Sequence, residues 1–193
     1  MVAAFSITRR STLMIRRALP SDANAIARVH IGSWQDAYRD LMPAEYLSSL
    51  ETTLAHRESF WARSIESDEP CVLVAELHEQ VVGWISVGAS RDEDATTDTA
   101  GEVMAIYVLA RHWQTGVGLA LWKAGLQWLM EQGYQRLTLW VLARNERAIR
   151  FYRRAGCVEE TGSERTLERG GVTLAEVRYG LALPDQVRLD RLP

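Results

Sequence analysis

The segment from Gly101 to Cys157 constrains the fold more than any other part of this chain of 193 residues. An apolar stretch, GEVMAIYVLA, leads into a glycine loop at 113–118, and an amphipathic stretch with helical periodicity follows and ends at Gly133. A strand that enters a helix through a glycine turn directs free backbone N–H groups, and the positive end of the helix dipole, at one place. Such a place suits an anion, and a pyrophosphate is the favoured ligand.

Two other phosphate-binding loops do not fit this pattern. The dinucleotide loop needs a third glycine and an acidic residue about twenty positions later, and the Walker loop needs Gly-Lys-Ser/Thr. Here Gly118 is followed by Leu119 and Ala120. A nucleotide-binding protein of a different α/β class is therefore disfavoured.

A second motif follows the next apolar stretch, LTLWVL, and reads Asn-x-x-Ala-x-x-Phe-Tyr-x-x-x-Gly, at Asn145, Ala148, Phe151, Tyr152 and Gly156. Together with Tyr107-Val108 and Gly116-Val117-Gly118, this motif resembles the GNAT superfamily of acyl-CoA-dependent N-acyltransferases. The resemblance implies a mixed α/β (α+β) fold, in which helices flank a central, mostly antiparallel sheet whose central strands splay apart.

The resemblance also implies acetyl-CoA as the acyl donor, with its pantetheine arm paired to a strand edge at Ile106, Tyr107 and Val108. Main-chain N–H groups of the loop would hold the pyrophosphate, at Trp113, Gln114, Thr115, Gly116, Val117, Gly118 and Leu119. Asn145 is expected to cap the following helix and to contact the cofactor. Two departures stand out, since Trp113 replaces a common Arg or Gln and Ala110 a frequent Pro. They remove a side-chain contact with phosphate and leave a backbone cradle intact.

Tyr152 lies where the family places the group that assists the leaving thiolate, although a lone tyrosine is more often a packing residue. Many relatives carry a glutamate base where this chain has Leu139-Trp140-Val141. Glu102 is the best alternative, because it points to the same face of the strand as Ile106. It lies about 13 Å from Ile106 along the strand, so it would act through water. A solvent-facing charge at the strand end is the competing interpretation of Glu102.

The acceptor is expected to be a primary amine of a small molecule or peptide. Trp34 and Tyr38 are candidate acceptor-binding residues, with burial in the core as the alternative. An acidic loop at 89–100, with Asp92, Glu93, Asp94 and Asp98, could attract a cationic amine. A catalytically silent acyl-CoA-binding regulatory domain of the same fold stays open as the second function.

Composition predicts one domain at 14–193, preceded by a loose extension at 1–13. Lys and Arg total 22 against 25 Asp and Glu, a net charge of −3, so nucleic acid is not an expected partner. Without a long apolar run, no membrane partner and a cytoplasmic location are predicted, and a homodimer stays open. Cys71 and Cys157 are expected to be reduced core residues, and the four histidines lack metal-ligand spacing, so no metal is expected.

Periodicity and turn residues predict the remaining elements. Strands are expected at 15–18, 71–77, 81–88, 101–109, 137–142 and 172–183, the last paired with 157–163 across Gly170-Gly171. Helices are expected at 20–38, at 43–65 with a break near 51–53, at 116–132 and from Asn145. The third of these helices is predicted to bury Leu119, Trp122, Leu126, Leu129 and Met130.

Overall fold

Strands and helices alternate along the chain in the computed structural model, which describes residues 12–93 and 99–184. The strands are β1 (Met14–Arg17), β2 (Cys71–Leu77), β3 (Gln80–Ala89), β4 (Ala100–Val108), β5 (Arg136–Leu142), β6 (Val158–Glu159), β7 (Arg165–Arg169) and β8 (Val172–Ala182). The α-helices are α1 (Ala23–Ala37), α2 (Ala44–Ser49), α3 (Leu54–Glu66), α4 (Val117–Glu131) and α5 (Glu146–Arg154). Short 3-10 turns are η1 (Pro20–Asp22), η2 (Leu50–Thr53) and η3 (Ala110–His112).

The described strands form one eight-stranded sheet in the order β1-β2-β3-β4-β5-β8-β6, with β7 paired to β8. Every pairing is antiparallel except that of β4 with β5. This confirms the predicted fold class.

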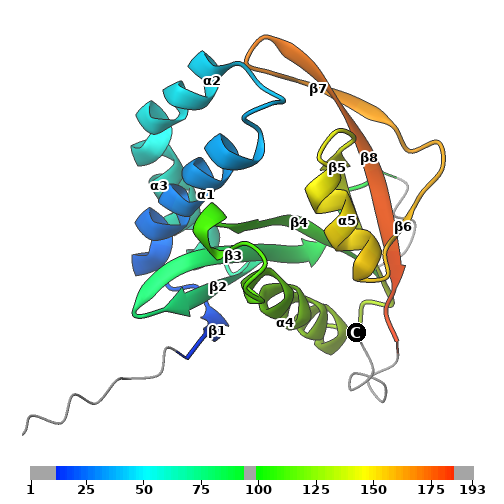
Figure 1. Ribbon diagram of the computed structural model, residues 1–193. Coiled ribbons are helices and arrows are strands. Elements are labelled where there is room, and N and C mark those ends of the chain that lie inside the picture. Colours follow the sequence, from blue (N-terminus) through cyan, green and yellow to red (C-terminus); the bar gives the residue numbers. More distant parts are fainter. Residues whose placement is uncertain (1–11, 94–98, 185–193) are drawn as a thin grey trace, which may run out of the picture.

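Helices cover both faces of the sheet because alternate strand residues point to opposite sides. Val74 and Trp84 pack with α1 and α3, whereas Ile85 and Val87 belong to the cluster that buries α4. Figure 1 shows α1, α2 and α3 gathered on one side of the sheet and α4 on the other.

The helix α4 begins after Gly116 and ends before Gly133, and both glycines have a positive φ, 91° and 87°. Most of its predicted stripe is buried, but Leu119 is 40 % exposed, so that prediction was wrong. The buried face of α4 instead includes Val117, Leu121 and Gly125, which are spaced four residues apart.

The strands β4 and β5 pair at only three positions and then separate. Ala100–Glu102 lie opposite Arg136–Thr138, after which β4 stays with β3 as far as Val108 and β5 stays with β8 as far as Leu142. The central strands therefore splay, as the resemblance implied, and they leave an opening in the sheet.

The last hairpin differs from the prediction. Residues 165–169 of β7, not 157–163, pair with β8 across Gly170 and Gly171, while β6 pairs with the far end of β8. The hairpin reaches toward α2 (Figure 1), where Leu167 and Leu174 share a cluster with Tyr46.

The predicted extension at 1–13 lies outside the described residues up to position 11, and Leu13 packs against the main core. Cys71 and Cys157 are free and buried, as predicted. Burial raises the pKa of Cys71 to about 11 and that of Cys157 to about 12. Among the described helices, none is long and apolar enough to cross a membrane.

Candidate active site

A cleft of about 1030 Å³ lies where β4 and β5 diverge, and α1, α5 and the β7–β8 hairpin complete its walls. Most of the predicted site residues line it: Trp34, Tyr38, Glu102, Ile106, Tyr107, Val108, Trp113, Gln114, Gly116, Gly118, Leu119, Asn145 and Tyr152. Two do not: Val117, the first residue of α4, is buried in the main core, and Thr115 is exposed, with its hydroxyl donating a hydrogen bond to the His112 carbonyl.

The exposed edge of β4 follows from its hydrogen bonding to β3. The Leu109 N–H donates to the Val82 carbonyl at 3.0 Å. Because bonded and non-bonded pairs alternate in an antiparallel ladder, Tyr107 also bonds to β3, whereas Ile106 and Val108 turn their N–H and C=O groups toward the cleft. Tyr107 therefore contributes its side chain to the cleft wall and not its backbone, unlike the prediction.

Trp113 closes one side of this edge. Its indole N–H donates to the Val108 carbonyl at 2.8 Å, and the Arg147 guanidinium carbon lies 3.2 Å from the centre of the indole ring. Trp113 follows β4 and Arg147 belongs to α5, so the stack spans the splayed strands. Burial lowers the pKa of Arg147 below its ordinary value. The sequence analysis missed this contact, since nothing local pairs the two residues.

The two glycines of the loop meet different structural requirements. Gly116 needs the left-handed conformation, with φ at 91°. A Cβ on Gly118 would lie 3.9 Å from Phe151 and 4.0 Å from Val108, which are ordinary contacts, so the fold does not require glycine there. The N–H groups of 117–119 find no acceptor among the described residues, as expected at a helix N-terminus. The missing Cβ leaves room for a group that approaches these donors.

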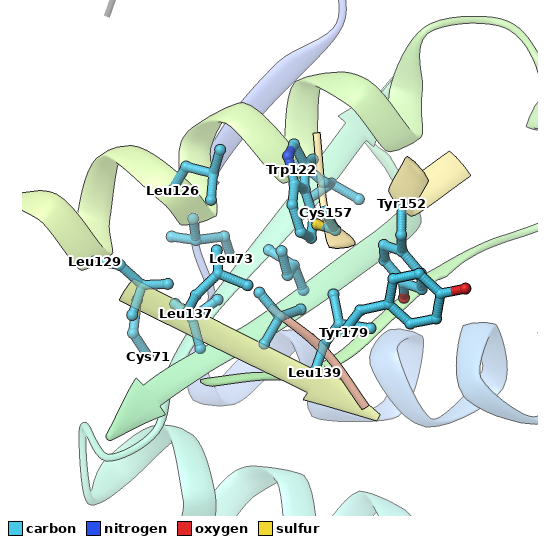
Figure 2. Close-up of a cluster of buried hydrophobic side chains, with 14 of the residues drawn as sticks. Cys71, Leu73, Trp122, Leu126, Leu129, Leu137, Leu139, Tyr152, Cys157 and Tyr179 are labelled. Carbon is cyan, nitrogen blue, oxygen red and sulfur yellow. The ribbon is translucent and has the colours of Figure 1, made fainter. Parts of the chain in front are cut away.

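Asn145 caps α5 as predicted, since its side-chain oxygen accepts from the Ala148 N–H at 3.2 Å. Tyr152, one helical turn after Ala148, is 8 % exposed and belongs to the main core cluster. Its ring centre lies 5.6 Å from that of Trp122. Figure 2 shows Tyr152 at the end of this cluster that is far from Leu129.

No hydrogen bond of the Tyr152 hydroxyl is found among the described residues, and the residue lines the cleft. Burial raises the pKa of this phenol above its ordinary value. The phenol therefore keeps its proton at neutral pH and is available as a donor to a ligand in the cleft.

Glu102 lines the cleft but is only 2 % exposed, so the solvent-facing alternative was wrong. Its carboxylate accepts hydrogen bonds from the Arg91 main-chain N–H at 3.0 Å and from Arg91 Nε at 2.9 Å, and it also pairs with Nη2. Glu102 thus anchors the start of the loop after β3, and its contacts with Arg91 engage both carboxylate oxygens.

The end of the cleft beside α1 is aromatic. The Trp34 and Tyr38 rings meet edge to face at 5.1 Å, and the Tyr38 hydroxyl lies 3.4 Å from the Tyr107 hydroxyl. Trp34 and Tyr38 line the cleft and also pack in an aromatic cluster, and their role in binding the acceptor stays a prediction. Burial raises the pKa of Tyr38 and of Tyr107, so both phenols are neutral.

Asp92 of the acidic loop does not present a free negative charge to the cleft. Asp92 accepts hydrogen bonds from the Trp140 indole N–H at 2.8 Å and the Thr138 hydroxyl at 3.3 Å, and it pairs with Arg178. These contacts turn its carboxylate into the sheet. Glu93 is exposed, and Asp94 and Asp98 lie outside the described residues.

Charged residues of the hairpin, which the sequence analysis missed, line the cleft instead. Arg165 stacks on Trp140 at 3.8 Å and pairs with Glu176 at 2.9 Å. The strand that carries Arg165 has no apolar alternation, so no local signal placed it near the site. Within residues 12–93 and 99–184, no group of three His, Cys, Asp or Glu side chains could hold a metal ion.

Comparison with known proteins agrees with this architecture. The family model described as Acetyltransferase (GNAT) family matches residues 33–157. The N-acetyltransferase YuaI of Bacillus subtilis (strain 168), itself uncharacterized, is 34 % identical over 180 residues, which cover 92 % of this chain and 96 % of YuaI. The chain therefore belongs to the GNAT acetyltransferase family, a class of acyl-CoA-dependent N-acetyltransferases.

Two solved structures share the fold at low identity. The PaiA N-acetyltransferase of Thermoplasma acidophilum, in complex with coenzyme A, has a TM-score of 0.70 and 17 % identity over 89 % of this chain and 99 % of its own. The yncA protein of Salmonella typhimurium, with its cofactor acetyl-CoA, has a TM-score of 0.67 and 20 % identity over 92 % of this chain and 97 % of its own.

Proposed function

We propose that this protein transfers an acetyl group from acetyl-CoA to the primary amine of a small molecule or peptide by direct attack. One observation carries the proposal: the splay of β4 and β5 brings a free strand edge, the N-terminus of α4 and the Tyr152 phenol to one cleft. The coenzyme A and acetyl-CoA complexes of PaiA and yncA support the choice of acyl donor.

The residues present fit acetyl-CoA. The N–H groups at 117–119 and the space beside Gly118 suit the pyrophosphate. The cleft-facing groups of Ile106 and Val108 can pair with the amide-bearing arm, although Trp113 already occupies the Val108 carbonyl. The Val108 N–H is left to donate toward the thioester oxygen, where negative charge develops as the amine attacks.

Tyr152 serves the leaving group in this proposal. Its protonated, unpartnered hydroxyl can donate a hydrogen bond to the thiolate as that charge forms. Because burial holds the phenol neutral, the donor persists across the whole physiological pH range.

The mechanism also needs a base. A protonated amine with a pKa near 10 must lose a proton before it attacks. We propose Glu102, acting through water, as the group that receives it. The contacts of Glu102 with Arg91 favour the second candidate function, an acyl-CoA-binding domain without catalysis, because they occupy both carboxylate oxygens.

Two measurements test the proposal. Calorimetry should show that the protein binds coenzyme A and not ATP or NAD, and failure to bind coenzyme A would refute it. Mass spectrometry of amines incubated with acetyl-CoA should show an acetylated product among polyamines, amino acids, aminoglycosides or peptides. Binding with no product from any of these would favour the silent domain. A single domain at 14–193, a cytoplasmic location and a homodimer stay predictions.

A further inference from the structure

One residue of α1 carries an unexplained buried hydroxyl. Ser33 is 2 % exposed, its Oγ is buried, and no described residue hydrogen-bonds to it. A helical serine normally bonds back to the carbonyl four residues earlier or faces water. A buried hydroxyl without a partner is destabilising and rare in folded proteins, so its presence needs a reason.

Ser33 also lines the cleft, together with Trp34 and Ala37 of the same helix and Tyr38, which follows its last turn. Its neighbour Gly32 places this turn of α1 beside the end of β4, because a Cβ there would lie 3.4 Å from the Leu109 side chain. Ser33 therefore lies in the wall of the cleft near the end of β4, with its Oγ just beneath the surface of that wall.

We propose that the Ser33 hydroxyl binds the amide-bearing arm of the acyl donor, by donating a hydrogen bond to one of its carbonyl oxygens. This inference rests on the proposed function, in which that arm lies along the backbone of Ile106 and Val108. The strand edge then holds the arm through main-chain groups, and Ser33 holds it through a side chain on α1. Ligand binding satisfies a hydroxyl that the free protein leaves without a partner.

The proposal predicts opposite effects of one substitution on stability and on affinity. Ser33→Ala removes an unpartnered group from the free protein, so the melting temperature should rise by roughly 2–4 °C. The same change removes a hydrogen bond from the complex, so affinity for coenzyme A should fall about three- to tenfold. A serine with a purely structural role would lower the melting temperature and leave the affinity unchanged.

Ser86 offers a matched control. It is equally buried, at 2 % exposure, but its hydroxyl contacts Met104 Sδ at 3.9 Å and it does not line the cleft. Ser86→Ala should leave affinity for coenzyme A unchanged and should not raise the melting temperature.

Calorimetry on the full chain should compare wild type, Ser33→Ala and Ser86→Ala with two ligands. The first is coenzyme A and the second is its nucleotide half, 3′-phosphoadenosine diphosphate, which lacks the arm. We expect Ser33→Ala to weaken only the first. Equal affinity of wild type and Ser33→Ala for coenzyme A, an equal loss with both ligands, or a lower melting temperature would overturn the assignment. Wild type that fails to bind coenzyme A would instead refute the proposed function.

Discussion

Replacement of Tyr152 by Phe tests the proposed chemistry most directly. The substitution removes the hydroxyl and keeps the ring, which packs against Trp122 at 5.6 Å. Because that hydroxyl makes no hydrogen bond with the described residues and faces the cleft, its removal costs the free protein no internal hydrogen bond. The melting temperature and the affinity for acetyl-CoA should therefore stay at the wild-type values.

The expected loss of turnover follows from the pKa of the phenol. Burial raises the pKa of Tyr152 above its ordinary value, which is near 10, whereas a thiol has a pKa of about 8.5. Full proton transfer to the thiolate is thus uphill, and a hydrogen bond to the charge is the available contribution. Such bonds contribute about 1.5–3 kcal/mol, which corresponds to a loss of roughly 10- to 150-fold in turnover.

The assay is release of free thiol from acetyl-CoA in the presence of the amine that the screen identifies. Tyr179 supplies the control, because it is buried in the same cluster and its hydroxyl donates to Glu159 at 2.7 Å and accepts from Arg153 at 3.1 Å. Tyr179→Phe should lower the melting temperature by roughly 2–4 °C and leave turnover unchanged. Normal turnover in Tyr152→Phe, or stability lost in step with activity, would refute the catalytic role.

Three further predictions concern the loop, the base and a buried histidine. Gly118→Ala should weaken coenzyme A binding without lowering the melting temperature. Gly125→Ala, whose Cβ would meet Ile85 Cδ1 at 2.8 Å, should lower the melting temperature without weakening coenzyme A binding. Equal coenzyme A affinities of wild type and Gly118→Ala in calorimetry would exclude the loop from the binding site. Glu102→Gln should lower turnover mainly at acidic pH with little change in acetyl-CoA affinity. If Arg91→Gln gives the same pH–rate profile, Glu102 only anchors the loop. The pKa of His30 is lowered from 6.5 to about 3, chiefly by burial and also by a nearby guanidinium. As pH falls, the histidine of the unfolded chain is protonated near pH 6.5, whereas that of the folded protein stays neutral down to about pH 3. The free energy of unfolding should therefore decrease between pH 6.5 and 3, by at most about 1.4 kcal/mol per pH unit. Thermal melts of His30→Phe should lack this contribution.

Local rules were sufficient where one residue determines the backbone. Gly116 and Gly133 marked the ends of α4 because both adopt a positive φ, and Asn145 marked the start of α5 because its side chain caps it. The apolar runs of β2 and β5 were equally clear, since both are buried on two faces.

Contacts between distant segments could not be predicted in this way. The sequence RTLER of β7 has neither alternation nor β-branched enrichment, so its strand exists only because β8 offers it a partner. Strand parity correctly placed Glu102 at the cleft but gave no sign of Arg91, which comes from a loop eleven residues earlier. The unpartnered state of Ser33 is likewise visible only once α1 lies beside the end of β4.

The two ends of the cleft differ in how far the family match covers their residues. The end proposed to hold the acyl donor is built from 101–157, which lies within the residues 33–157 that the family model matches. The end proposed to hold the acceptor is also lined by residues of the β7–β8 hairpin that lie beyond that match: Arg165, Leu167, Arg169 and Glu176. Family membership thus supports the choice of acyl donor, but it carries no information on these hairpin side chains. The acceptor must be found by experiment, and variants of the hairpin should change the KM for the amine while leaving affinity for coenzyme A unaltered.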